Sequence, residues 1–100
     1  MQYTPRPGIA RVSLCGTVVL VPSRAAFGFC KNIQPLSLFE SMIWTGIEKN
    51  YPVEKILEGF HIFSKAPDDE LIAKIDNCCQ KLLEKGFILP KPEEAGSNAP

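Results

Sequence analysis

The segment from Asp68 to Leu89, DDELIAKIDNCCQKLLEKGFIL, constrains the fold more than any other stretch of the chain. Three consecutive acidic residues after Pro67 predict a helix start, because acidic side chains cap free N–H groups and suit the positive end of the helix dipole. Gly86 predicts the helix end, since glycine readily adopts the left-handed conformation found there. The apolar side chains between these signals cover a sector of about 140° at about 100° per residue. A helix on a two-layer core commonly needs an apolar stripe of about 100°, so we expect a buried helix with surplus apolar surface.

The surplus has two interpretations. One apolar stripe contains Leu71, Ile75, Cys78 and Leu82, and a second beside it contains Ile72, Cys79 and Leu83. Either both stripes are buried, or the second lines a groove that a partner fills. The opposite margin carries a row of lysines, Lys74, Lys81 and Lys85. This row is either a solvated face or an electrostatic guide for an acidic ligand.

Three short strands are predicted before the helices. The alternation of Ala10, Val12 and Leu14 with polar residues indicates a half-buried strand. The β-branched run TVVLVP follows it, so the two strands form a hairpin with a tight turn at Cys15-Gly16. The stretch KNIQPL, residues 31–36, predicts a third strand. Pro35 places that strand at a sheet edge, because proline cannot donate to a ladder.

Two helices separate these strands from the 68–89 segment. Ser37 and Glu40 have the spacing of a capping box, which predicts a helix start at Ser37. Tyr51-Pro52 ends this helix, and VEKILEGFHIF, residues 53–63, predicts the next. Strands followed by helices indicate an α+β fold with the helices on one face of a small sheet. We expect residues 1–89 to form a single domain, and the proline-rich, polar residues 90–100 to form a disordered tail.

The predicted edge strand is itself a candidate binding element. Its outer edge leaves backbone N–H and C=O groups unpaired, and an extended peptide can add there as a further strand. Pro35 is equally consistent with protection of the edge against aggregation.

Composition and motifs exclude several classes of function. Eleven basic and eleven acidic residues argue against a protein that grips nucleic acid. The chain lacks a signal peptide and the roughly 18 apolar residues of a membrane span, so we expect an intracellular, cytoplasmic protein. The cysteines, Cys15, Cys30, Cys78 and Cys79, lack zinc-site spacing and are expected to be reduced. His61 is the one histidine, and phosphate-loop and hydrolase motifs are absent, so we expect no enzyme activity, cofactor or metal.

Four motifs resemble the PqqD family, the small proteins of pyrroloquinoline quinone biosynthesis and related recognition domains of systems that modify ribosomally made peptides. They are CGTVVLVP, LSLFESMIW, YPVEKILEGF and LLEKGFI, and the similarity covers about residues 8 to 89. Ser37 stands where the family favours asparagine, which preserves capping. The connector SRAAFGFCKN is longer than in compact members, which leaves the register of the third strand open.

The resemblance implies a winged-helix-like fold that binds the leader segment of a precursor peptide between its third strand and third helix. It also implies presentation of that peptide to a separate modifying enzyme, often a radical SAM enzyme. The implied strand contacts are Lys31, Asn32, Ile33 and Gln34. The implied helix contacts are Ile72, Cys79 and Leu83, with Lys74 and Lys85 as partners of acidic residues.

Two alternatives remain open from the sequence. A second copy of the chain could fill the groove, with edge strands pairing across a twofold axis in a homodimer. A winged helix could instead place its third helix in a DNA major groove. Zero net charge and a third helix rich in Leu, Ile and Cys argue against the DNA-binding alternative.

Overall fold

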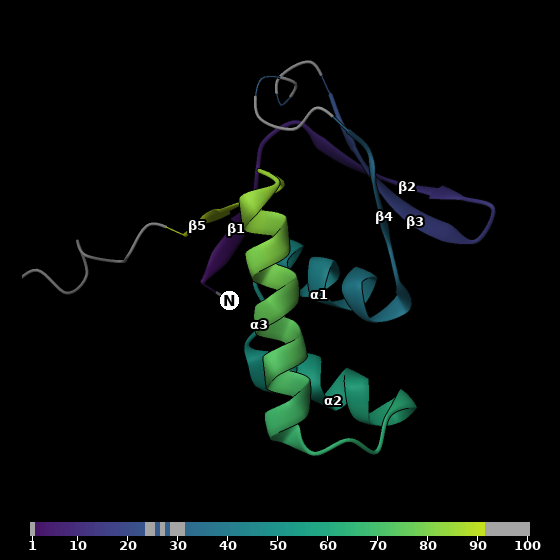
Figure 1. Cartoon of the computed structure of the whole chain (residues 1–100), viewed down its shortest axis with the longest axis vertical. Helices are drawn as coiled ribbons and strands as arrows, with labels where there is room; N and C mark the ends of the chain where they lie inside the picture. Colours follow the sequence, from purple (N-terminus) through teal and green to yellow (C-terminus); the bar gives the residue numbers. More distant parts are fainter. Residues whose placement is uncertain (1, 24–25, 27, 29–31, 92–100) are drawn as a thin grey trace, which may run out of the picture.

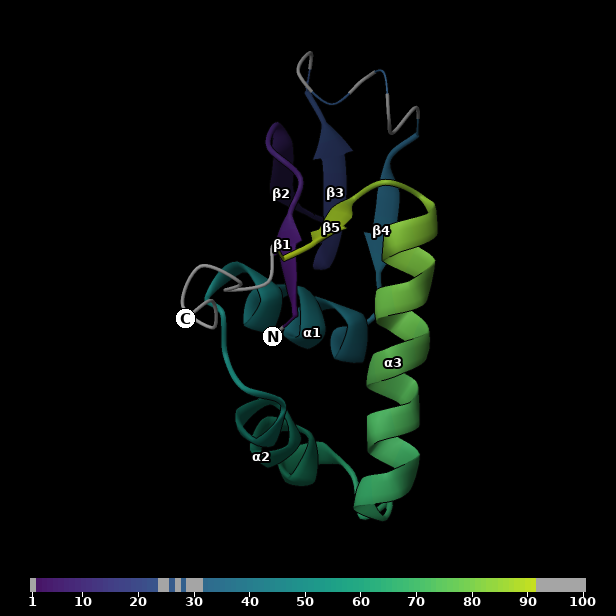
Figure 2. The same ribbon diagram turned by 90° about the vertical axis from the view of Figure 1, so that its left-hand side faces the viewer.

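The computed structural model describes residues 2–23, 26, 28 and 32–91, and confirms an α+β fold of antiparallel strands and three helices. The elements in chain order are β1 (Tyr3–Pro5), β2 (Ile9–Leu14), β3 (Thr17–Pro22), β4 (Gln34–Leu36), α1 (Leu38–Glu48), α2 (Val53–Phe63), α3 (Asp68–Glu84) and β5 (Ile88–Pro90). The sheet β2–β3–β4 stands above α1, and α3 runs along one side (Figures 1 and 2). Helix α2 lies at the end of the molecule far from this sheet.

Strands β2 and β3 form the predicted hairpin. Cys15 and Gly16 both have positive φ, 50° and 80°, as a two-residue type I′ turn requires. Leu14 pairs with Thr17 on the two sides of this turn. The expectation that Ala10 and Leu14 face the core is wrong, because both are exposed. Much of the hairpin projects beyond the helices, which leaves its outer residues uncovered (Figure 1).

Strand β4 is the edge strand of the three-stranded sheet, with β3 as its neighbour. It is shorter than the predicted strand at 31–36, since Asn32 and Ile33 precede it and Lys31 lies outside the described residues. Val18 pairs with Leu36 and Leu20 with Gln34 in an antiparallel register. The prediction that Pro35 lies on an edge strand is confirmed.

The second sheet joins the two ends of the described chain. Tyr3 pairs with Pro90 and Pro5 with Ile88. Just beyond the pairing, the Lys91 backbone N–H donates to the Gln2 carbonyl at 2.7 Å. The domain boundary predicted after residue 89 is therefore too early, because Pro90 and Lys91 belong to the fold. Residues 92–100, the rest of the predicted tail, lie outside the described residues.

Helix α1 begins with the predicted capping box. The Ser37 backbone N–H donates to the Glu40 carboxylate at 2.9 Å, and the Glu40 N–H donates to the Ser37 hydroxyl at 3.2 Å. Helix α2 has the predicted bounds, and Gly86 follows α3 with a φ of 85°. The expected side-chain cap on α3 is wrong, because Asp68 instead contacts His61 at 2.7 Å.

The core lies where the three helices meet the inner face of the sheet. Trp44 and Phe60 are its largest fully buried side chains, and Leu20 contributes to it from β3. On α3 the buried residues are Leu71, Ile75, Cys78, Cys79 and Leu82. Both cysteines are thus core residues, and α3 is fixed at a defined rotation against the sheet and α1.

Candidate functional site

An open groove of about 610 Å³ lies between α3 and the start of α1, where the chain leaves β4. Its apolar lining includes Phe39 and the buried Ile43 of α1 and the exposed Ala73 of α3, and most of its other lining residues are polar. The full lining is Ser37, Phe39, Glu40, Ile43, Glu70, Ala73, Lys74, Asn77, Cys78 and Lys81. An open, mainly apolar groove beside an edge strand is a site where an extended segment can bind.

The outer edge of β4 can be derived from the hairpin register. A two-residue turn makes Leu14–Thr17 a hydrogen-bonded pair, and such pairs alternate along an antiparallel ladder. The backbone groups of Val18 and Leu20 therefore point toward β4. Gln34 and Leu36, their partners, point back toward β3, and the Pro35 carbonyl points outward. Since proline has no N–H, the outward edge at this position offers an acceptor alone.

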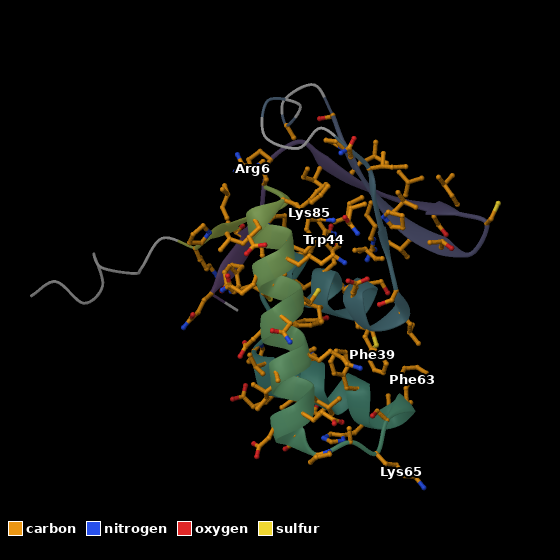
Figure 3. All side chains as sticks on the ribbon, viewed as in Figure 1. Arg6, Phe39, Trp44, Phe63, Lys65 and Lys85 are labelled. Carbon is orange, nitrogen blue, oxygen red and sulfur yellow. The ribbon has the colours of Figure 1, made fainter. Side chains whose placement is uncertain are left out.

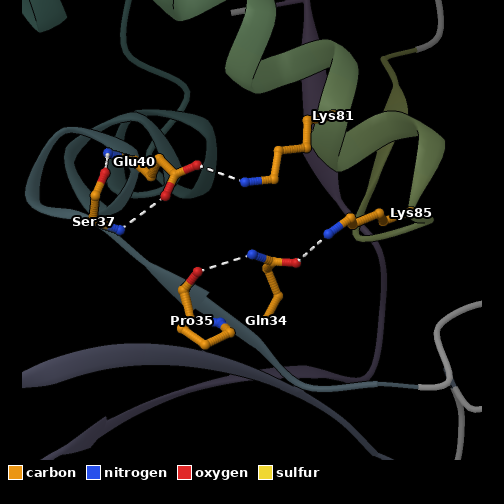
Figure 4. Close-up of polar contacts among 6 residues, drawn as sticks. All are labelled: Gln34, Pro35, Ser37, Glu40, Lys81 and Lys85. Atoms are coloured by element: carbon orange, nitrogen blue, oxygen red, sulfur yellow. Dashed lines mark hydrogen bonds and ion pairs between the residues drawn. The ribbon is translucent and has the colours of Figure 1, made fainter.

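Gln34 joins this edge to α3 (Figure 4). Its side-chain Nε2 donates to the Pro35 carbonyl at 2.9 Å, and its Oε1 accepts from Lys85 Nζ at 2.8 Å. Gln34 is only 9% exposed, and a buried amide needs hydrogen-bond partners. These two bonds supply a partner for its nitrogen and one for its oxygen. Lys85, which caps the sheet end of α3, thus contacts the edge strand directly (Figure 4).

A second bridge lies beside the first, between Lys81 and Glu40 (Figure 4). Lys81 Nζ lies 3.1 Å from a Glu40 carboxylate oxygen, and the other oxygen accepts from the Ser37 N–H. Burial alone would raise the pKa of the Glu40 carboxyl. The hydrogen bonds from Ser37 and the charge and hydrogen bond of Lys81 outweigh burial and lower that pKa below its ordinary value. Glu40 is therefore a carboxylate at neutral pH.

Lys74 and Cys78 complete the α3 side of the groove. Lys74 Nζ lies 4.6 Å from the centroid of the Phe39 ring, within cation–π range. Burial, followed by the negative charge of Glu40, raises the pKa of the Cys78 thiol to about 12. Cys78 is therefore a protonated, apolar wall residue at neutral pH. Lys74, Cys78 and Lys81 line the groove, and Lys85, the C-cap of α3, continues their row toward β4. We call these four residues the groove margin of α3.

The other predicted helix contacts lie on the opposite margin of the apolar stripe. Cys79 is 2% exposed and lines a separate hollow of about 440 Å³ together with Tyr3 and Val53. Ile72 and Leu83, seven residues before and four after Cys79, share its face of the helix. We call Ile72, Cys79 and Leu83 the β1 margin. The lining of the groove includes none of the three: Cys79 lies in the hollow beside Tyr3, Ile72 is 37% exposed, and Leu83 is half-buried against the core. Their role in peptide binding stays a prediction.

The structure therefore brings together part of the predicted site. Gln34 and Lys85 are in contact, Lys74 lines the groove, and the exposed Asn32 and Ile33 lead into β4. Sequence reasoning did not assign Ser37, Phe39, Glu40, Asn77, Cys78 and Lys81 to the site. The lysine row beside Cys78 was the available signal, and a solvated face was one interpretation of it. Lys85 is exposed and the Lys81 side chain is 43% exposed, and both also bridge to neighbouring elements, Lys81 to α1 and Lys85 to β4.

Among residues 2–23, 26, 28 and 32–91, no group of three His, Cys, Asp or Glu side chains is placed to hold a metal ion. Over the same residues, each helix is too short or too polar to cross a membrane.

The fold, but not the sequence, has a known counterpart. No family model and no curated protein sequence matches this chain. The structure is similar to that of lasso peptide synthetase B1 complexed with the leader peptide, with a TM-score of 0.74. The two chains are 16% identical, and the similarity covers 90% of this chain and 100% of the other. At this identity the likeness establishes a shared fold.

Proposed function

We propose that this protein is a non-catalytic adaptor that binds the leader segment of a ribosomally made precursor peptide as an added strand on β4. The bound peptide would lie over the groove and be presented to a separate modifying enzyme, a radical SAM enzyme by the resemblance to the PqqD family. The observation that carries the proposal is an edge strand beside an open, mainly apolar groove. The leader peptide in the complex of similar fold supports it.

Strand addition explains how the two features act together. The outward backbone groups of Ile33 and Pro35 would pair with the peptide and supply affinity independent of its side chains. Alternate peptide side chains would then point into the groove, since side chains alternate along a strand. Phe39 and Ala73 offer an apolar surface for them, with the buried Ile43 beneath. Sequence preference would come from that surface and from the charged rim.

The chemistry of the rim supports binding rather than catalysis. A thiol whose pKa is raised to about 12 is not a nucleophile at neutral pH, so Cys78 has no activated form here. Glu40 has a lowered pKa and accepts from both Ser37 and Lys81, whereas a general base needs a pKa near the working pH. The groove residues are arranged to hold a segment of chain.

The decisive experiment is an NMR titration of labelled protein with leader segments of precursor peptides encoded beside its gene. We expect saturable shifts at residues 32–36 and along the groove margin. Ile33→Pro should weaken binding more than tenfold, because it removes an outward N–H at the edge and distorts it. Ser13→Pro is the matched control, since the same register turns Ser13 outward on β2, the other edge of this sheet.

Three results would contradict the proposal. Equal loss of binding in both proline variants would show a general effect of disrupted strands rather than addition to β4. Shifts confined to Tyr3, Val53 and Cys79 would move the site to the other hollow. A tight dimer by light scattering, with shifts at β4 only on dilution, would assign the groove to a second copy of the chain.

A further inference from the structure

The Gln34 amide occupies the position that an added strand would use. The Pro35 carbonyl is the outward acceptor of β4, and an incoming strand would donate a backbone N–H to it. That carbonyl already accepts from the Gln34 side chain, at 2.9 Å. Gln34 therefore substitutes for the first hydrogen bond of a bound strand.

The orientation of this amide is fixed by its two partners. A carbonyl can only accept and an ammonium can only donate, so Nε2 must face Pro35 and Oε1 must face Lys85. A side chain at position 34 that could not both donate to the Pro35 carbonyl and accept from Lys85 would leave one of these groups without its partner. A donor from a peptide could replace Gln34 at Pro35, but Lys85 would then need a new acceptor.

Lys85 differs from Lys74 and Lys81 in the chemical group that its ammonium contacts. Lys81 lies against a carboxylate, and Lys74 lies over an aromatic ring. The acceptor for Lys85 is a neutral amide, and none of the salt bridges found among the described residues involves it. The bond from the Lys85 ammonium to the Gln34 amide is already charge-assisted, but a carboxylate would add the attraction between two opposite charges. The positive charge of Lys85 is thus available for a stronger partner.

We infer that the edge of β4 selects a peptide with an acidic side chain, Asp or Glu, whose carboxylate takes Lys85 from Gln34 Oε1. This inference rests on the proposed strand addition. As the peptide N–H takes the Pro35 carbonyl, the Gln34 side chain is released at both ends. Gln34 is then a placeholder, because its amide supplies the hydrogen bond to the Pro35 carbonyl in the free protein. Lys85 is the residue that determines the preference for an acidic side chain.

The test uses short peptides selected from a randomised display library on the wild-type protein. Each selected acidic peptide is compared with its amide counterpart, Asp→Asn or Glu→Gln, by calorimetry. We expect the acidic form to bind about tenfold more tightly to the wild type and less than about twofold more tightly to Lys85→Met. Lys65→Met is the matched control, because Lys65 is exposed at the opposite end of the molecule, and it should keep the full discrimination (Figure 3).

The role of Gln34 can be measured separately, by NMR of its side-chain amide and by the peptide affinity of a Gln34 variant. Its side-chain amide resonances should shift on binding as Nε2 leaves the Pro35 carbonyl. Gln34→Met, which is similar in size and cannot bridge, should bind the acidic peptide about threefold more tightly if Gln34 competes with the peptide. Weaker binding by a folded Gln34→Met would assign Gln34 a structural role and overturn the placeholder.

The two proposals fail in different ways. If the selected peptides shift residues 32–36 but acidic and amide forms bind equally, the acidic preference is overturned and strand addition stands. If no selected peptide shifts residues 32–36, strand addition itself is overturned, and the acidic preference with it.

Discussion

The two margins of α3 carry neighbouring cysteines yet have different surroundings. On the groove margin, Cys78 lies beside lysines that reach α1 and β4. On the β1 margin, Cys79 lies behind Tyr3 and Val53 and is nearly inaccessible. The N-terminal segment lies beside Cys79, whereas Ile72 of the same margin is 37% exposed, and the open groove is rimmed by lysines. Surplus apolar surface on a helix therefore does not by itself identify a binding surface, since part of it can be buried beside a distant strand.

The largest expected effect tests whether the β1 margin is closed. Cys79→Asp places a charge where the side chain is almost fully buried, and we expect it to lower the free energy of unfolding by more than about 3 kcal/mol. Asn77→Asp makes a similar change at an exposed position of the groove, where we expect less than about 0.5 kcal/mol. Urea unfolding followed by circular dichroism measures both. A Cys79→Asp variant as stable as Asn77→Asp would remove the contrast between the margins.

The next effect separates stability from peptide affinity. Tyr3 is half-buried against the core on the β1 side, so Tyr3→Ala should cost about 2 kcal/mol of stability. Its effect on peptide affinity should be less than about twofold, because the groove lies on the other margin. Ile33→Ala is the reciprocal variant, since Ile33 is exposed next to β4 and should change affinity more than stability. If Tyr3→Ala weakens peptide binding as strongly as Ile33→Ala, the hollow beside Cys79 belongs to the site.

Local signals made most of the fold predictable from the sequence. The hairpin follows from alternation and a glycine turn, and α1 from a capping box only four residues long. Pro35 placed β4 at an edge because a missing N–H is a property of one residue. In each case the residues that decide the structure are close in the chain.

The rest depends on contacts between distant residues. Tyr3 and Pro90 pair across nearly the whole described chain, and neither of the three-residue strands β1 and β5 has a recognisable pattern. Helical periodicity fixes the angle between Lys81 and Cys79 but not the rotation of α3 against the sheet. That rotation decides which margin faces β4. The candidate residues were therefore predicted in part. The sequence placed the margin of Ile72, Cys79 and Leu83 at the groove, whereas Lys74, Cys78 and Lys81 line it.

The smallest expected effect concerns the Glu40 bridge on the groove margin. Glu40→Gln keeps an oxygen that can accept from the Ser37 N–H but removes the ion pair with Lys81. At neutral pH we expect a loss of about 1 kcal/mol, because the pair is partly exposed and the carboxylate also suits the start of α1. The pKa of Glu40 is lower in the folded state than its ordinary value of 4.5. Its contribution is therefore complete above that value and is lost as the pH falls through the lowered folded-state pKa.

Stability measured across the acid range tests this account of the bridge. The wild type and Glu40→Gln should differ at neutral pH and converge in acid, because a protonated Glu40 resembles glutamine. Glu58→Gln, at an exposed position on α2, corrects for the loss of one negative charge outside the groove. A constant difference between wild type and Glu40→Gln at every pH would mean that the carboxylate charge does not stabilise the groove margin. In that case Lys81 would be as available to an acidic peptide as Lys85, and the distinction between the two bridges would not hold.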